Sequence, residues 1–399
     1  MECVFVCDAG TSSLKTALIS ADGSIVKESR FYFTQKLTAE YYLKHLLIAF
    51  DKMQNFAKTQ RIKIAGICIS GNGPSLVASF NVKTDDKLLL WNEDCSKLKL
   101  NEKEKSFYCQ LKNSGSIFLP RLFLFVKKYS AQIQNAKYIL PLPEYLSYKL
   151  TGKAFVFLPE ARYTKAYWSK VAIKKCESFF AENLSLLFFN EKIPTFVNAG
   201  QVIGSYAGIP VIAGAPDFFV ALLGTKTIKP FYACDRAGTS EGINLCLNFK
   251  PDGKNKFRVL PSPLQEHWNI SALLGETGML SKNTNESLAT IANITDLQKL
   301  KANKNLIAFF TEFKNSIKEL EEIAKTKLDF VLTGGQARNS NLNQAKANIT
   351  GRKFYLTQTF NAELLGAAIL AFTALNYFPN LEIASEAIVK ITKVFEPKA

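Results

Sequence analysis

A duplicated turn restricts the fold of this chain more than any other feature. Near the start, an apolar segment at 3–7 leads into Asp8-Ala9-Gly10-Thr11-Ser12 and then into a second apolar run. In the second half, Arg236-Ala237-Gly238-Thr239-Ser240 is again followed by an apolar run. Because strand, tight turn and strand occur once in each half, the sequence predicts two related α/β domains that arose by internal duplication.

The rest of the chain alternates between strand-like and helix-like segments. Its 399 residues suffice for two or three domains, and we place the domains at 1–228 and 229–399. The hydrophobic periodicity predicts a three-stranded meander over 3–33, helices over 39–60, 305–327 and 362–375, two helices within 117–152, a helix beginning at 216–217, and strands at 62–70, 209–213, 232–234, 243–247 and 330–332.

Composition argues against several classes of protein. Fifty Lys and Arg against 34 Asp and Glu give a net charge of +16, but the lysines are scattered, so we expect no nucleic-acid partner. Two His and eight Cys without a CxxC pair provide little material for a zinc site or a Ser/His/Asp triad. No signal-like start and no apolar run of ~20 residues is present, so we expect a cytoplasmic protein with no membrane partner.

The repeated Gly-Thr-Ser turns are candidate phosphate-binding loops. A glycine without a Cβ lets backbone N–H groups and neighbouring hydroxyls converge on phosphate oxygens, although the same composition is common in ordinary hairpins. Asp8 precedes the first turn and could bind Mg²⁺ beside the phosphates or serve only as a local turn residue. Lys15 could offer a cation to a phosphoryl group or be a solvated strand lysine.

Asp217 is the strongest candidate for a catalytic residue. It follows Gly214-Ala215-Pro216 at a predicted strand-to-helix junction, where a carboxylate could accept the proton of an attacking hydroxyl. The alternative is an aspartate that only caps the helix.

Gly334-Gly335 could permit close approach of a base or ribose, with Asn339 offering an amide to adenine, or could simply form a turn. Trp91 could stack on a sugar or lie in a core.

Taken together, these segments resemble the FGGY carbohydrate kinases, a branch of the superfamily of hexokinase, actin and the heat-shock chaperone ATPases. Residues 8–15 match the first phosphate motif Asp-x-Gly-Thr-Ser-x-x-Lys, and Asp217 falls at the catalytic base of a Gly-Ile-Pro-Val-x-x-Gly-x-x-Asp segment. The further counterparts are the second phosphate motif at 238–240, the adenosine motif at 332–339, the segment 144–152 and the helix 362–371. These motifs follow the family's order along essentially the whole chain.

The resemblance implies two ribonuclease-H-like domains of the actin-like ATPase kind, connected by the helices that begin at Asp217 and Ala362, with ATP in an interdomain cleft. It implies ATP-dependent phosphorylation of a hydroxyl on a small sugar or polyol, with a pentulose favoured, and leaves a homodimer open. Asp217 would be the general base and Asp8 the Mg²⁺ ligand. The expected ATP and phosphate contacts are Gly10, Thr11, Ser12, Lys15, Gly238, Thr239, Ser240, Gly334, Gly335 and Asn339, and the expected sugar contacts are Asn72, Gly73, Pro74, Trp91, Asp217 and Phe218.

The sequence departs from the family in three places. The second domain is short and lacks the Pro-Tyr-Leu-x-Gly-Glu-Arg segment near 280–305, and the sugar loop has the small residues 72–75. Glu241 directly follows the second Gly-Thr-Ser, where a negative charge would repel phosphates unless it points away or binds metal. Two alternatives therefore stay open: a catalytically silent nucleotide-binding regulator, and an actin-like or chaperone-like ATPase.

Overall fold

The computed structural model of the chain describes residues 1–80, 86–159, 161–164, 166–167, 170–187, 189–238, 240–252, 256–264, 266–275, 277 and 304–398. The chain folds into two compact units. Unit 1 consists of Met1–Ala21, Ile25–Phe218 and Leu370–Tyr377, and unit 2 of Asp22–Ser24, Phe219–Ile369 and Phe378–Ala399.

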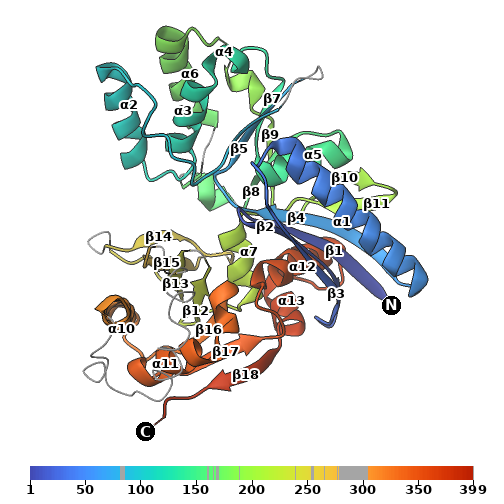
Figure 1. The fold of residues 1–399 in the computed structure, drawn as a ribbon, viewed down its shortest axis with the longest axis vertical. Coiled ribbons are helices and arrows are strands. Elements are labelled where there is room, and N and C mark those ends of the chain that lie inside the picture. The colour runs from blue at the N-terminus through green and yellow to red at the C-terminus, as the bar shows by residue number, and fades with distance from the viewer. Residues whose placement is uncertain are drawn as a thin grey trace. The chain divides into compact units, whose positions relative to one another are not determined.

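Unit 1 contains a six-stranded mixed sheet in the order β10-β11-β4-β1-β2-β3 (Figure 1). Its strands are β1 (Glu2–Ala9), β2 (Ser13–Ser20), β3 (Ile25–Tyr32), β4 (Lys63–Gly71), β10 (Val202–Tyr206) and β11 (Ile209–Ile212). The first three form the predicted meander, which is confirmed. Strands β1, β4 and β11 run parallel to one another, so their carboxyl ends lie at the same edge of the sheet.

Helix α1 (Ala39–Thr59) covers this sheet (Figure 1). It begins where the hydroxyl of Thr38 accepts a hydrogen bond from the backbone N–H of Tyr41 at 3.1 Å. The residues that it buries recur at helical spacing, and among them the ring of Phe50 packs edge-on against Phe5 of β1, with centroids 5.2 Å apart. The sequence prediction of this helix is confirmed.

The part of the chain between β4 and β10 forms a further group of strands and helices in unit 1. Its strands are β5 (Leu76–Ser79), β6 (Lys87–Leu89), β7 (Tyr138–Pro141), β8 (Phe155–Leu158) and β9 (Thr195–Asn198), and its α-helices are α2 (Glu102–Asn113), α3 (Leu119–Lys128), α4 (Ser130–Ile133), α5 (Leu142–Thr151) and α6 (Lys170–Leu184).

The stretch 117–152 differs from its prediction as two helices. Strand β7 interrupts it and pairs antiparallel with β5, because Ile139 and Leu140 are buried in that small sheet. Pro143 then lies in the first turn of α5, consistent with the preference of proline for a first helical turn. Helix α5 ends at Gly152 with a left-handed φ of 71°, as predicted.

Unit 2 repeats the arrangement of unit 1. Its seven-stranded sheet has the order β14-β15-β13-β12-β16-β17-β18, in which β12, β16 and β17 are parallel and the remaining neighbours antiparallel. The bounds are β12 (Ala233–Ala237), β13 (Glu241–Leu247), β14 (Arg258–Pro261), β15 (Trp268–Leu273), β16 (Phe330–Thr333), β17 (Phe354–Thr357) and β18 (Ile391–Phe395). The order β10-β11-β4-β1-β2-β3 corresponds to β18-β17-β16-β12-β13-β15, and the predicted duplicated fold is confirmed.

Helices α10 (Lys304–Ala324), α11 (Ser340–Thr350) and α13 (Leu381–Ile388) complete unit 2. The inner face of α10 carries Phe309, Phe310 and Phe313, which join the hydrophobic core beneath β13, β15 and β16. The predicted helix at 305–327 is thus confirmed.

The chain passes from one unit to the other within two helices, α7 (Asp217–Gly224) and α12 (Ala362–Ala374), and also on either side of 22–24 and between 377 and 378. Inside unit 2 their backbones touch: a Cβ on Gly366 would lie 1.8 Å from the carbonyl oxygen of Val220, and one on Gly224 would lie 1.9 Å from that of Ala362. Only glycine fits at these two positions. Neither helix, nor any other in the described part of the chain, is long and apolar enough to span a membrane.

Glu144 is a buried carboxylic acid in the first turn of α5. Its Oε1 accepts a hydrogen bond from the backbone N–H of Phe157 at 3.2 Å, and burial raises its pKa from 4.5 to about 8. A folded-state pKa above the unfolded value means that this group contributes stability below about pH 4.5 and loses that contribution as the pH rises through about 8.

We therefore expect Glu144→Gln to remove this pH dependence, because glutamine has similar shape and stays neutral. The melting temperature of the variant should match that of the wild type at pH 5 and exceed it at pH 8.5. Thermal unfolding of both proteins over pH 5 to 8.5 measures the difference, in which the other titrating groups cancel. If the melting temperatures of the two proteins changed with pH in the same way, the raised pKa of Glu144 would be contradicted.

Candidate functional site

In unit 1, three loops meet at the carboxyl ends of β1, β4 and β11. The backbone N–H of Asn72 donates to the carbonyl oxygen of Ala9 at 3.1 Å, which joins the loop after β4 to the end of β1. Gly71 and Pro216 form an isolated parallel bridge, which joins the same loop to the start of α7. The first phosphate turn, the predicted sugar loop and Asp217 therefore lie next to one another.

The first phosphate turn is held by hydrogen bonds from two directions. The phenol of Tyr42, on α1, donates to the carbonyl oxygen of Gly10 at 2.8 Å, and burial raises the pKa of this phenol. From the other side, the indole N–H of Trp91 donates to the hydroxyl of Thr11 at 3.0 Å. Ser12 at the tip of the turn is exposed. The turn is thus fixed in place while its tip faces solvent.

Asp8 and Lys15 form an ion pair across the first hairpin. They are register partners in β1 and β2, and the Lys15 Nζ lies 2.7 Å from the Asp8 Oδ2, with side-chain exposures of 17% and 4%. The described residues contain no group of three or more His, Cys, Asp or Glu that could hold a metal ion. One carboxylate at the phosphate turn fits Mg²⁺, which usually binds through one or two carboxylates and otherwise through water and substrate phosphates.

The predicted sugar loop at 72–75 is tightly packed. The buried Asn72 side chain donates from Nδ2 to the carbonyl oxygen of Ala9 at 2.9 Å and accepts a hydrogen bond from the hydroxyl of Ser75. The next residues, Gly73 and Pro74, are joined by a cis peptide bond. A Cβ on Gly73 would lie 3.4 Å from the ring of Phe118, so the loop packs against an aromatic side chain.

Trp91 is the most accessible of the predicted sugar contacts. Its side chain is 42% exposed, and its backbone N–H donates to the hydroxyl of Ser75 at 3.0 Å. Together with the bond from its indole to Thr11, this places the ring between the sugar loop and the phosphate turn. Its exposed surface suits stacking on a sugar ring.

Asp217 is the first residue of α7 and is half-buried. Its Oδ1 accepts a hydrogen bond from the backbone N–H of Phe218 at 2.6 Å. The ring of Phe218 lies beside those of Tyr163 and Tyr167, with centroids 6.5 and 6.4 Å away. The sequence alone did not single out these two tyrosines.

In unit 2 the second phosphate turn and the adenosine loop are also neighbours. The backbone N–H of Gly238 donates to the carbonyl oxygen of Ser240 at 2.9 Å, which closes the turn, and Ser240 is exposed. Thr239 lies outside the described residues. Gly334 follows β16 with a φ of +95°, and a Cβ there would lie 2.3 Å from the carbonyl oxygen of Ala237. Gly335 has open space beside it.

Asn339 caps α11. Its Oδ1 accepts hydrogen bonds from the backbone N–H groups of Asn341 and Leu342, each at 3.1 Å. The carbonyl half of its amide is therefore engaged in the helix, and the NH₂ half is the part that could meet a base.

Glu241 turns away from the phosphate turn. Its Oε1 lies 2.7 Å from the Nζ of Lys346, a buried lysine on α11, and its side chain is fully buried. The negative charge that follows the second Gly-Thr-Ser is thus neutralised inside the unit, and it does not face the position expected for phosphate.

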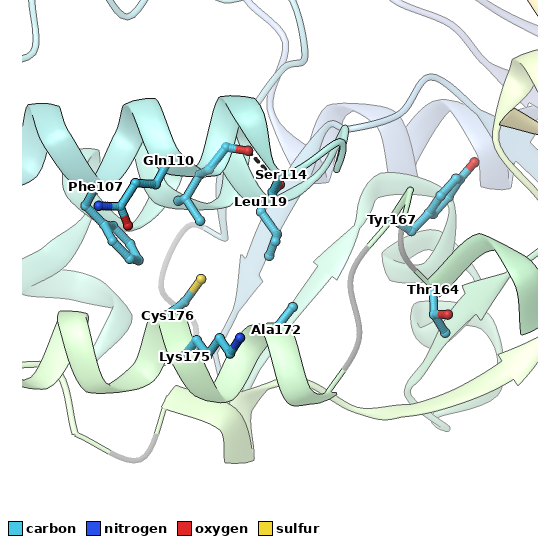
Figure 2. Close-up of a pocket in the computed structure, with 10 residues that line it drawn as sticks. Phe107, Gln110, Ser114, Leu119, Thr164, Tyr167, Ala172, Lys175 and Cys176 are labelled. Carbon is cyan, nitrogen blue, oxygen red and sulfur yellow. Dashed lines mark hydrogen bonds between the residues drawn. The ribbon is translucent and has the colours of Figure 1, made fainter. Parts of the chain in front are cut away.

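Figure 2 shows a pocket of about 630 Å³ elsewhere in unit 1. Side chains from α2 and α6 form two of its walls, with Cys176 and Phe107 pointing into the space between these helices. Its lining is Phe107, Gln110, Leu111, Ser114, Leu119, Thr164, Tyr167, Ala172, Lys175 and Cys176. None of the predicted site residues lines this pocket.

Comparisons with known proteins agree with the motifs. Residues 305–375 match the C-terminal domain of the FGGY family of carbohydrate kinases. A xylulose kinase from Brucella ovis is 16% identical, with a TM-score of 0.78 over 99% of this chain and 95% of that one. The Plasmodium falciparum glycerol kinase with ADP is 14% identical, with a TM-score of 0.73 over 100% and 94%, and a gluconate kinase from Lactobacillus acidophilus is 17% identical, with a TM-score of 0.71 over 100% and 94%.

A comparison with curated protein sequences gives no match. The structural likenesses show that the whole chain has the fold of these kinases, and the resemblance to the FGGY carbohydrate kinases is confirmed.

The contrast between Gly334 and Gly335 generates a test of the adenosine loop. Gly334→Ala should lower the free energy of unfolding by about 2 kcal/mol or more, because the Cβ meets the carbonyl oxygen of Ala237 and alanine disfavours the positive φ. Gly335→Ala, with nothing within 4 Å, should change it by at most about 0.5 kcal/mol. Urea denaturation compares the two, and equal effects would refute the close contact.

Proposed function

We propose that this protein is an ATP-dependent carbohydrate kinase that phosphorylates a hydroxyl of a small sugar or polyol, with a pentulose as the first acceptor to test. The observation that carries the proposal is the convergence, at one sheet edge of unit 1, of the first phosphate turn, the loop 72–75 and the start of α7, where Asp217 stands. The match of residues 305–375 to the FGGY C-terminal domain supports it independently.

Asp217 is the general base of the proposed reaction. The acceptor hydroxyl oxygen attacks the terminal phosphorus of ATP, the bond from that phosphorus to the bridging oxygen breaks, and the hydroxyl proton passes to the Asp217 carboxylate. ADP is the leaving group. The position of Asp217 as the first residue of α7 favours its ionised form, because the amino end of a helix stabilises negative charge.

The first phosphate turn and its ion pair stabilise charge on the moving phosphoryl group. Thr11 and Ser12 offer hydroxyls, and Lys15 offers a positive charge beside Asp8. Asp8 would hold Mg²⁺, which when bound neutralises charge on the phosphate oxygens. In unit 2, the turn 238–240 would contact phosphate through its backbone.

The remaining proposed contacts are those to the adenosine and those to the sugar. Gly334 and Gly335 would let the nucleoside approach the backbone, with the NH₂ group of Asn339 directed to adenine. Since both polar groups of the Asn72 side chain are engaged, one by Ala9 and one by Ser75, we assign sugar contact chiefly to the ring of Trp91 and to the backbone around Gly73 and Pro74. Phe218 would line the same side as Asp217.

An acceptor panel tests the proposed activity. We expect ADP release, followed in a coupled assay, to rise when a pentulose, another sugar or a polyol is added to enzyme and MgATP. No ADP release with any acceptor, together with ADP binding, would replace the kinase by a silent nucleotide-binding regulator. Hydrolysis stimulated by protein or peptide instead would indicate an actin-like or chaperone-like ATPase.

Substituting the base tests the mechanism. Asp217→Asn should lower turnover by ~10² or more, because the amide cannot take the hydroxyl proton, while ADP affinity stays close to that of the wild type. The matched control is Asp51→Asn, the same change at an exposed position of α1. Steady-state kinetics and calorimetry with ADP provide both readouts. Turnover of Asp217→Asn near that of the control would refute the assignment.

A further inference from the structure

A continuous chain of hydrogen bonds links the second phosphate turn to the adenosine loop inside unit 2. The Nε2 of Gln336 donates to the carbonyl oxygen of Gly238 at 2.9 Å and to the hydroxyl of Thr277 at 2.8 Å. The Thr277 hydroxyl donates in turn to the Oε2 of Glu241 at 2.7 Å. Gln336 belongs to the segment that follows Gly334-Gly335, so the chain spans both loops expected to hold the nucleotide.

The far end of this chain is anchored by a buried ion cluster. The Nζ of Lys346 lies 2.5 Å from the Oδ2 of Asp235 and 2.7 Å from the Oε1 of Glu241, and all three side chains are at most 1% exposed. The ring of Phe313, on α10, faces the same ammonium group, with its centroid 4.8 Å away.

The charges in the cluster keep the lysine protonated. Burial alone would lower the pKa of Lys346, but the attraction of Asp235 and Glu241 outweighs it and raises this pKa. Burial, with the repulsion of Glu241, raises the pKa of Asp235. Glu241 is therefore held by a fixed positive charge on one oxygen, and its other oxygen is available to the Thr277 hydroxyl.

The chemistry of the groups fixes the direction of every bond. An ionised carboxylate only accepts, so the single hydroxyl proton of Thr277 must go to Glu241. The hydroxyl oxygen then accepts from Gln336, and the two hydrogens of the Gln336 amide nitrogen are both used, one on Thr277 and one on Gly238. The amide nitrogen of Gln336 has no hydrogen left for a ligand.

We propose that Gln336 is a positioning residue that fixes the second phosphate turn against the adenosine loop, supported through Thr277 by the buried Glu241–Lys346 ion pair. The inference rests on the proposed function in that both loops hold ATP. Gln336 acts through Gly238, whose backbone must keep its place for the turn to meet phosphate. Because binding to a turn that is already ordered costs less entropy, the network raises nucleotide affinity.

This role predicts which kinetic constants change when the Gln336 bonds are lost. Loss of the Gln336 bonds should affect the nucleotide and leave the acceptor unaffected, since the sugar contacts that we assign lie in unit 1. Lys346 is a poor position for the test, because removing one partner of a buried ion pair leaves an uncompensated charge and threatens folding. Gln336 can be changed with the ion cluster intact.

Gln336→Met keeps the length of the side chain and removes both donors. We expect the Kd for ADP and the KM for ATP to rise about tenfold, as the loss of one to two neutral hydrogen bonds predicts, with the KM for the acceptor unchanged. The matched control is Gln344→Met on α11, where the amide nitrogen also donates twice, to Asn348 at 2.9 Å and to the carbonyl oxygen of Glu396 at 2.7 Å. This control should keep the ADP affinity of the wild type.

A second variant tests the route of the coupling. Thr277→Val removes the middle hydroxyl, and it should weaken ADP binding in the same direction. The double variant should bind ADP less than about threefold more weakly than Gln336→Met alone, because both changes break one chain. A double variant whose loss of ADP affinity equals the product of the two single losses would overturn the proposed route.

The outcomes separate this inference from the proposed function. Calorimetry with ADP needs no phosphoryl transfer, so a wild type that binds ADP but phosphorylates no acceptor would overturn the kinase and leave the role of Gln336 to be decided by the variants. Unchanged ADP affinity in Gln336→Met, or equal losses in Gln336→Met and Gln344→Met, would overturn the inference even in an active kinase. A wild type that binds no ADP would overturn both.

Discussion

The close approach of backbone at the ends of parallel strands is the constraint on which both candidate loop regions depend. In unit 1 a Cβ on Gly71 would lie 2.7 Å from the carbonyl oxygen of Ala9, and in unit 2 a Cβ on Gly334 would lie 2.3 Å from that of Ala237. Ala9 and Ala237 occupy the same place in the two repeated turns. In each unit a glycine therefore brings the loop after the neighbouring strand onto the phosphate turn.

The two units use charge differently behind this shared geometry. The Asp8–Lys15 pair of unit 1 is a cross-strand contact in which Asp8 is buried and Lys15 keeps 17% of its side chain exposed. In unit 2 the charges of Asp235, Glu241 and Lys346 are buried in the core. Because the cluster is buried, its charges do not reach a ligand. The cluster is also rigid, since moving one of the three side chains away would leave a buried charge without an opposite charge beside it.

Local signals sufficed for much of the fold and for the loop positions. The meander, α1, β4 and the segments around Asp217 and Gly334 were predictable because alternation, apolar spacing and glycine turns act within a few residues. Strand β7 was not, because Ile139 and Leu140 become a strand only by pairing with β5, far away in the sequence. The same limit applies to Glu241: its neighbours in the chain indicate a phosphate turn, while its direction is set by Lys346, over a hundred residues later.

The packing of unit 1 also bears on how an acceptor could be chosen. The loop 72–75 is small, and its one amide side chain is occupied by Ala9 and Ser75, so it has little capacity to distinguish sugars through side chains. The aromatic rings of Tyr163 and Tyr167 lie beside Phe218, next to the proposed base. Flat rings restrict the shape and orientation of a bound sugar more than they select particular hydroxyls. We therefore expect acceptor choice in this protein to depend on ring shape and length, with Asp217 selecting the hydroxyl that comes within its reach.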